Sequence, residues 1–216
     1  MPHSLERKGR LLTNIRNDIF PSEVLTQEMS IEEQVSEIKK MLRLSMNGTA
    51  SQIMKENGIG YSLNYGVDLP RIKEIASGIE KDSRLAVRLW KENIRECRML
   101  AAFVYPTDEF ETDMADLWVS QIEYPDLAEV CSMYLFSKIK GVSVTAFRWI
   151  ASEEEMCQYC GFLVVANLLR EGGQMSQRFI SELKDQAAAA ISGGKVLPSQ
   201  AARAVMALLE REDGQE

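Results

Sequence analysis

The segment Gly161-Phe162-Leu163-Val164-Val165-Ala166 mixes small and large apolar residues inside a long apolar stretch. Small residues let a helix approach its neighbour closely, and large ones fill the space that is left. Two further segments share this mixture, and they are Arg98-Met99-Leu100-Ala101-Ala102-Phe103-Val104 and Ala202-Arg203-Ala204-Val205-Met206-Ala207-Leu208-Leu209. Similar helices that recur along one chain are typical of stacked helix pairs.

Helical periodicity extends outward from these segments, and no stretch alternates apolar and polar residues between turns as a strand would. Because the connections are short, neighbouring helices must run antiparallel. The pattern predicts an all-α fold: an α–α superhelix of HEAT-like repeats, in which antiparallel helix pairs build a curved solenoid. An irregular helical bundle is the alternative. We expect helices at 31–46, 48–57, 69–79, 82–92, 94–105, 108–121, 125–139, 142–151, 153–171, 175–192 and 198–212.

Local signals mark several boundaries of these helices. Asp68 precedes Leu69-Pro70, so it supplies a capping carboxylate to a helix whose first turn accepts proline. Ser152, with Glu155 three residues later, has the form of a capping box. Glycines that favour a left-handed helix end stand at Gly141, Gly172-Gly173 and Gly193-Gly194. We expect the HEAT-like domain to cover residues 31–213, preceded by a charged, irregular N-terminal extension at 1–30 with one short helix.

Charge and hydropathy limit the class of protein. The 216 residues include 25 Lys and Arg against 32 Asp and Glu, a net charge of −7, which argues against a simple basic binder of nucleic acid or membranes. No apolar run approaches the roughly 18 residues of a membrane helix, and the polar start Met1-Pro2-His3-Ser4 lacks the apolar region of a signal peptide. We therefore expect a cytoplasmic protein with no membrane partner.

Cysteine and histidine give little support for metal or redox chemistry. His3 is the single histidine, so a triad or a multi-histidine metal site is hard to build. Cys157 and Cys160 have the spacing of a zinc or redox pair, but Cys97 and Cys131 are too far apart to form a second close pair. Buried cysteines are common in apolar helices, which favours structural thiols. We expect no metal and no cofactor.

The middle of the chain resembles the DNA alkylation repair (AlkD-like) family. Tyr65–Ile72 matches the family's Gly-Val-x-x-Pro turn, and Leu89–Ala101 matches its Leu-Trp helix followed by a Glu-x-Arg-x-x-Ala helix. Phe147–Glu154 is similar to the family's aromatic-Ser-Glu link into a long helix. The likeness runs from about Ile31 to Arg211. It implies a curved HEAT-like superhelix whose concave face holds duplex DNA, and active members release alkylated, positively charged purines.

The resemblance also implies a set of chemical groups: a Trp with an Asp four residues later, an Arg on the next long helix, and a Trp near the C-terminus. A ring face and a carboxylate stabilise the cation that develops as the glycosidic bond breaks, and an Arg holds a phosphate. Here Pro125 stands at the first Trp position, Glu129 at the Asp position and Tyr159 at the Arg position. Tyr124 offers an aromatic ring if the register shifts by one residue. The C-terminal region, 186–191, has no aromatic residue.

These matches give one candidate catalytic residue, Glu129, and a set of candidate DNA contacts. The DNA-binding candidates are Arg148, Trp149, Lys138, Lys140, Tyr124 and Tyr159. Arg148 beside Trp149 is the best candidate for a phosphate contact, although a tryptophan is more often a core residue. Arginines and lysines at 84–98 are expected to pair with nearby carboxylates at helical spacing. Residues 106–129 carry eight acids and no Lys or Arg, so they repel phosphates unless they lie on the convex, solvated side.

Three functions fit this sequence. The first is a DNA-binding protein of glycosylase fold that does not excise bases and recognises distorted or branched DNA by shape. The second is an active alkylpurine glycosylase with a rearranged site, using Glu129 with Tyr124 or Tyr159. The third is a HEAT-type scaffold whose acidic stretch at 106–129 binds a basic protein partner.

Overall fold

The described part of the chain in the computed structural model, residues 29–173 and 175–213, is helical. Its helices are α2 (Ile31–Leu44), α3 (Gly48–Glu56), α4 (Leu69–Ser77), α5 (Ser83–Trp90), α6 (Arg95–Val104), α7 (Thr112–Val119), α8 (Pro125–Tyr134), the 3₁₀ turn η1 (Phe136–Lys138), α9 (Val142–Ile150), α10 (Glu155–Arg170), α11 (Gln177–Ser192) and α12 (Val196–Asp213). Within this part no strand forms, and one isolated bridge joins Leu63 to Ile94. The predicted all-α class is confirmed. The expected extension falls mostly on residues 1–28, outside the described residues, and the domain division stays a prediction.

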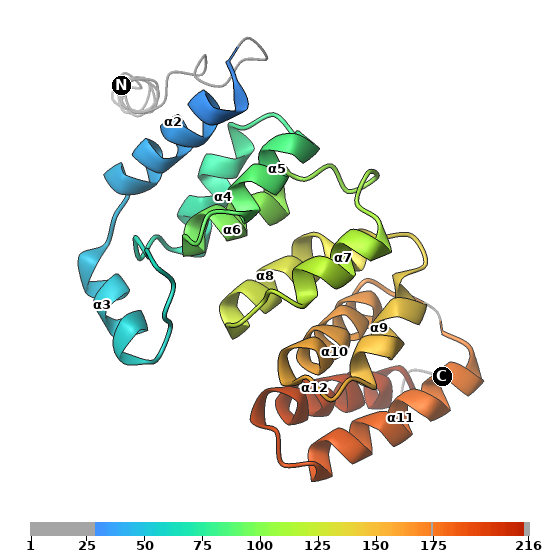
Figure 1. Ribbon diagram of the computed structural model, residues 1–216. Coiled ribbons are helices and arrows are strands. Elements are labelled where there is room, and N and C mark those ends of the chain that lie inside the picture. The colour runs from blue at the N-terminus through green and yellow to red at the C-terminus, as the bar shows by residue number, and fades with distance from the viewer. Residues whose placement is uncertain (1–28, 174, 214–216) are drawn as a thin grey trace, which may run out of the picture.

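The helices stack in two layers (Figure 1). Helices α4, α6, α8, α10 and α12 pack one against the next, and we call them the inner row. Helix α5 packs on α6, α9 on α10 and α11 on α12, while α7 also contacts α10. This succession of helix pairs is the expected HEAT-like arrangement. The three segments with similar mixtures of small and large residues all lie in the inner row, in α6, α10 and α12.

Close packing in the C-terminal half depends on a small residue. A Cβ at Gly161 would lie 2.7 Å from the Ile150 nitrogen and 2.8 Å from the Ala146 oxygen, so only glycine lets α10 approach α9 this closely. Helix α10 is apolar on most sides because α8, α9 and α12 surround it. Among its residues, Phe162 and Val165 have no exposed surface.

The predicted helix ends are largely found, with one correction. The Asp68 side chain accepts the Arg71 N–H at 2.8 Å and caps α4, as expected. Gly141 adopts the predicted left-handed conformation, with φ of 70°. The capping box at Ser152 is wrong: α10 begins after Glu154, and the Ser152 hydroxyl accepts the Glu154 N–H at 3.1 Å inside the preceding turn. Within the described ranges, no helix is long and apolar enough to cross a membrane.

Candidate nucleic-acid interface

Glu129 and Tyr159, chosen from the sequence at two separate family positions, meet at the contact between α8 and α10. The Tyr159 hydroxyl donates a hydrogen bond to Glu129 Oε1 at 3.0 Å. The Tyr159 side chain is buried, whereas Glu129 is exposed. Burial raises the pKa of Tyr159, and the nearby Glu129 carboxylate raises it further. The phenol therefore stays protonated at neutral pH and remains a donor to the carboxylate.

Tyr124 stands at the start of α8 and packs against the loop that follows α3. Its ring centroid lies 4.7 Å from that of Tyr61, with the planes tilted by 54°. The loop passes close by, since a Cβ at Gly60 would lie 3.0 Å from the Tyr124 hydroxyl. Burial, followed by the charge of Asp126, raises the pKa of Tyr61. Tyr124 is half-buried, so part of its ring serves this packing.

A single carboxylate holds both Arg148 and Trp149. Arg148 Nη2 lies 2.7 Å from Asp116 Oδ2, and the Trp149 indole N–H donates to Asp116 Oδ1 at 2.7 Å. The Trp149 side chain is only 3% exposed and packs against Phe136. Trp149 is therefore a core residue, and its indole face is covered by protein and is not open for stacking. Arg148 is exposed, but its charge is matched by Asp116.

Lys138 and Lys140, the remaining basic candidates, are exposed after α8. Lys138 forms an ion pair with Glu171. Both lysines line a cavity of about 510 Å³ that they share with Asp108 and Glu111. Nearby carboxylates therefore offset part of the positive charge of the two lysines.

The acidic stretch 106–129 does not form one uniform face. Asp116 binds Arg148 and Trp149, and Asp126 Oδ2 accepts from Arg95 Nε at 2.6 Å. The remaining acids of the stretch are exposed, and they are Asp108, Glu109, Glu111, Asp113, Glu123 and Glu129. Asp116 and Asp126 are thus paired within the protein, and Glu129 accepts the Tyr159 hydroxyl. The other five carboxylates are available to solvent or to a partner.

The residues that carry the family resemblance form a buried bracket at the start of α6. Glu96 is fully buried, and its carboxylate accepts the N–H groups of Tyr65 at 3.1 Å and Val67 at 3.2 Å. Arg95 Nη1 donates to Glu96 at 3.2 Å and to the Val67 carbonyl at 3.0 Å. The Gly-Val turn is therefore held onto the Glu-containing helix by hydrogen bonds. These motif residues therefore stabilise the fold. Arg95 and Glu96 are expected from the sequence to pair on the surface, but both side chains are buried.

Sequence reasoning missed a cluster that joins three helices of the inner row. Lys73 of α4 lies over the ring of Tyr134 of α8, with Nζ 4.9 Å from the ring centroid. Phe103 of α6 packs on the same tyrosine at a centroid distance of 4.7 Å. These residues are far apart in the sequence and share no local motif. Only the packing of α4, α6 and α8 reveals the cluster.

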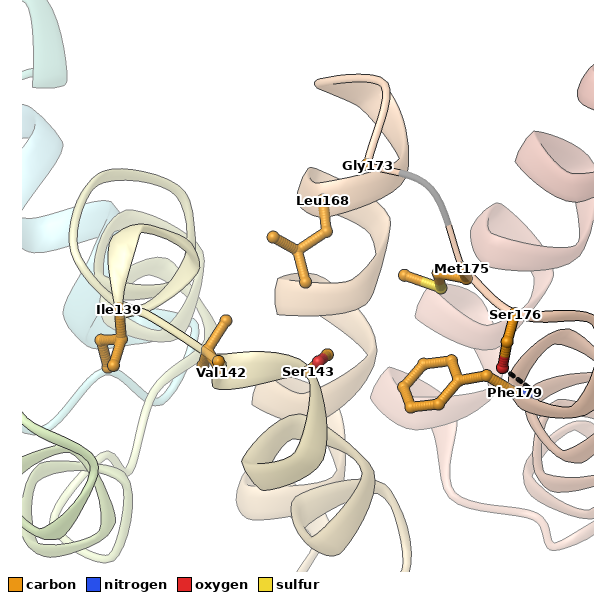
Figure 2. A pocket seen from close by; sticks show the side chains of 9 residues that line it. Ile139, Val142, Ser143, Leu168, Gly173, Met175, Ser176 and Phe179 are labelled. Carbon is orange, nitrogen blue, oxygen red and sulfur yellow. Dashed lines mark hydrogen bonds between the residues drawn. The ribbon is translucent and has the colours of Figure 1, made fainter.

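A second cavity, of about 300 Å³, lies among α9, α10 and α11 (Figure 2). Figure 2 shows Leu168, Met175 and Phe179 around it. The Ser176 hydroxyl at its edge already accepts the Phe179 N–H at 3.3 Å. None of the residues that line this cavity is charged, so it has no group for a phosphate.

The cysteines have the environment of structural thiols. All four are free, and Cys97, Cys131 and Cys160 are buried. Burial raises the pKa of Cys97 to about 12 and raises the pKa of Cys160 as well. A thiol with a raised pKa is a poor nucleophile and a poor metal ligand at neutral pH. In the parts of the chain that the structure covers, no cluster of His, Cys, Asp or Glu is arranged to hold a metal ion.

Known proteins resemble this chain both in sequence, over a region that includes the start of α6, and in the fold of helix pairs. A family model described as DNA alkylation repair enzyme matches residues 38–191, which is more than half of the chain. The chain belongs to this DNA alkylation repair family.

One solved structure is similar over 81% of this chain and 74% of its own, with a TM-score of 0.72 and 19% identity. It represents a family described as related to the HEAT-like repeat DNA glycosylases, with affinity for branched DNA structures. At this identity the likeness supports the HEAT-like fold. No curated protein matches the chain.

Proposed function

We propose that this protein binds branched or otherwise distorted DNA and does not excise bases. Membership of the DNA alkylation repair family supports a role on DNA. The HEAT-like fold, shared with a protein from a family that has affinity for branched DNA, supports recognition of shape. A rigid stack of helix pairs suits this task because it needs no base-specific contacts.

The observation that carries the absence of excision is the hydrogen bond between Tyr159 and Glu129. In the family these positions hold an Arg that binds phosphate and an Asp that faces the developing sugar cation. Here the two side chains satisfy each other at 3.0 Å. A tyrosine carries no positive charge to hold a phosphate, and Pro125 offers no ring at the Trp position. Without a ring and a phosphate clamp, a carboxylate alone gives little stabilisation to the breaking bond.

Gel-shift titrations test DNA binding directly. Linear, nicked and four-way branched duplexes of the same length and base composition are compared at low and at moderate salt. We expect the branched substrate to bind tightest. Absence of binding to every substrate at low salt would rule out the function.

A base-release assay tests the second half of the proposal. Wild-type protein and Glu129→Gln are incubated with methylated DNA, and freed bases are measured. We expect background release from both. Release by the wild type that Glu129→Gln abolishes would instead establish a glycosylase with a rearranged site, in which Glu129 is the carboxylate and Tyr124 or Tyr159 is the aromatic residue.

The exposed acids of residues 106–129 favour one other function, a HEAT-type scaffold for a basic protein partner. Asp108, Glu109 and Asp113 are exposed, as a docking surface requires. A stable complex with a basic protein, together with no retention on DNA or heparin, would favour the scaffold. The expected cytoplasmic location stays a prediction, which imaging of the tagged full chain tests.

A further inference from the structure

We propose that Lys73, Phe103 and Tyr134 form a stacking site for an unpaired nucleobase at a DNA branch point. This inference rests on the proposed function and extends it, because it names the part of the DNA that is recognised. A branch point interrupts the continuous stack of base pairs, and an unpaired base placed there has a π face free for stacking on a protein ring.

The three side chains come from consecutive helices of the inner row, α4, α6 and α8. The rings of Phe103 and Tyr134 lie 4.7 Å apart and are tilted by 44°. Both rings are half-buried, so each is held by packing while part of its surface faces solvent. Met133, which directly precedes Tyr134 in α8, is 44% exposed. A rigid, half-exposed aromatic pair is a suitable surface for base stacking, which accepts any base because every base has a π face.

Charge makes a nucleic acid the fitting occupant of this surface. Lys73 is exposed, and in the described part of the chain none of the ion pairs includes its Nζ, whose contacts are with Tyr134. By contrast, Lys138 and Arg148 are each paired with a carboxylate. Lys73 is therefore able to bind a phosphate without first breaking an ion pair.

The contact between Lys73 and Tyr134 is weak enough to be exchanged. Nζ lies 3.4 Å from the Tyr134 hydroxyl, at the long end for a hydrogen bond, and 4.9 Å from the ring centroid. A lysine on a flexible stem can move from the ring to a neighbouring phosphate, and a base then takes its place on the ring face. The cluster thus supplies a ring for the base and a cation for its phosphate. The apolar cavity of Figure 2 supplies no cation.

Fluorescence quenching measures stacking without any substitution. A fluorescent adenine analogue is placed unpaired at the branch point of one DNA and within a duplex arm of another. The wild-type protein should quench the branch-point probe and leave the arm probe nearly unchanged. Equal fluorescence changes at the two positions, on DNA that is fully bound, would overturn the inference.

Variants then assign the stacking to the cluster. Tyr134→Leu keeps an apolar contact with Phe103 but removes the aromatic face, so quenching should disappear and affinity for branched DNA should fall about tenfold. Linear duplex should bind as before. Phe147→Leu is the matched control, because Phe147 is a half-buried ring that packs on Phe179 at 3.7 Å outside the inner row. Equal losses in Tyr134→Leu and Phe147→Leu would show that general packing, not stacking, is responsible.

Lys73→Gln tests the phosphate contact and is safe for folding because Lys73 is exposed. It should weaken binding and lower the salt dependence by about one ion, while Lys91→Gln, another exposed lysine, should change neither. These experiments distinguish failure of the proposed function from failure of the stacking site. If the wild type binds no DNA, the proposed function is wrong. If the wild type binds branched DNA but the Lys73 and Tyr134 variants match their controls, only the stacking site is wrong.

Discussion

At the scale of single residues, Glu96 connects the sequence motif to stability. Its buried carboxylate accepts two backbone N–H groups and pairs with Arg95. Glu96→Gln leaves Arg95 with a weaker partner in a buried site and replaces one acceptor by a donor. We expect a loss of about 3 kcal/mol in the free energy of unfolding, measured by urea titration. Glu74→Gln breaks an exposed pair with Arg71 and should cost less than about 1 kcal/mol. Similar losses in both variants would contradict the role of the bracket.

Gly66 provides a second residue-scale prediction, because its backbone is left-handed and crowded. Its φ is 69°, and a Cβ there would lie 2.2 Å from the Asn47 oxygen. Gly66→Ala must therefore displace the turn from α3, and we expect it to destabilise the protein by about 3 kcal/mol. Gly58, with φ of 86° and open space around its Cβ position, is the matched control. Gly58→Ala should cost only about 1 kcal/mol in thermal or urea unfolding. Equal costs would mean that the close approach to Asn47 is unimportant.

At the scale of helices, the sequence predicts those features that depend only on residues close together in the chain, such as helix caps. The cap at Asp68 and the glycine at Gly141 are found because each satisfies its own helix end. The expected helix at 108–121 forms only from Thr112 to Val119, and it is preceded by a turn at 107–109 and by the buried side chain of Phe110. The contact of Tyr159 with Glu129 joins two helices. The helical periodicity of the sequence places Glu129 and Tyr159 on helices. It does not predict which turns of α8 and α10 face each other.

Helix α2 packs on the stack through buried apolar residues, and a carboxylate of the α5–α6 connection, Glu92, adds a contact whose strength depends on pH. Glu92 accepts from Lys39 of α2 at 2.6 Å and from Arg88 of α5 at 2.5 Å. Burial alone raises the pKa of Glu92, but these hydrogen bonds outweigh it and leave the pKa below the ordinary value of 4.5. The stabilisation is therefore fully present above pH 4.5 and is lost as the pH falls through the lower pKa of the folded state.

We accordingly expect Glu92→Gln to lower the free energy of unfolding by roughly 1 kcal/mol at pH 7, because the network is partly exposed. The difference from the wild type should shrink steadily as the pH falls below 4.5. Thermal unfolding followed by circular dichroism over this pH range checks both points. Glu37→Gln, which removes an exposed pair with Lys40, should have little effect at any pH. A Glu92→Gln deficit that persists unchanged in acid would contradict this account.

At the scale of the whole molecule, the acidic balance constrains how DNA is bound. A protein with a net charge of −7 gains little from long-range attraction to phosphates, so its affinity must come from local groups. Two of the basic side chains expected to contact DNA are instead paired with carboxylates: Arg148 with Asp116 and Lys138 with Glu171. The sequence gives the number of charges, but only the folded structure shows which basic side chains form ion pairs with carboxylates.

The cavity shared by Lys138, Lys140, Asp108 and Glu111 tests whether such cancellation limits DNA binding. If the two lysines lie in the interface, replacing Asp108 by Asn and Glu111 by Gln removes two negative charges near the phosphates. Because each charge at about 8 Å in water is worth roughly 0.5 kcal/mol, affinity for linear duplex should rise about fivefold at low salt. Above about 0.1 M salt the gain should fade, since the Debye length is then near 10 Å. Fluorescence anisotropy over a salt series measures this, with the exposed pair Asp113→Asn and Glu123→Gln as control. An equal gain from the control pair would assign the effect to net charge and remove Lys138 and Lys140 from the interface.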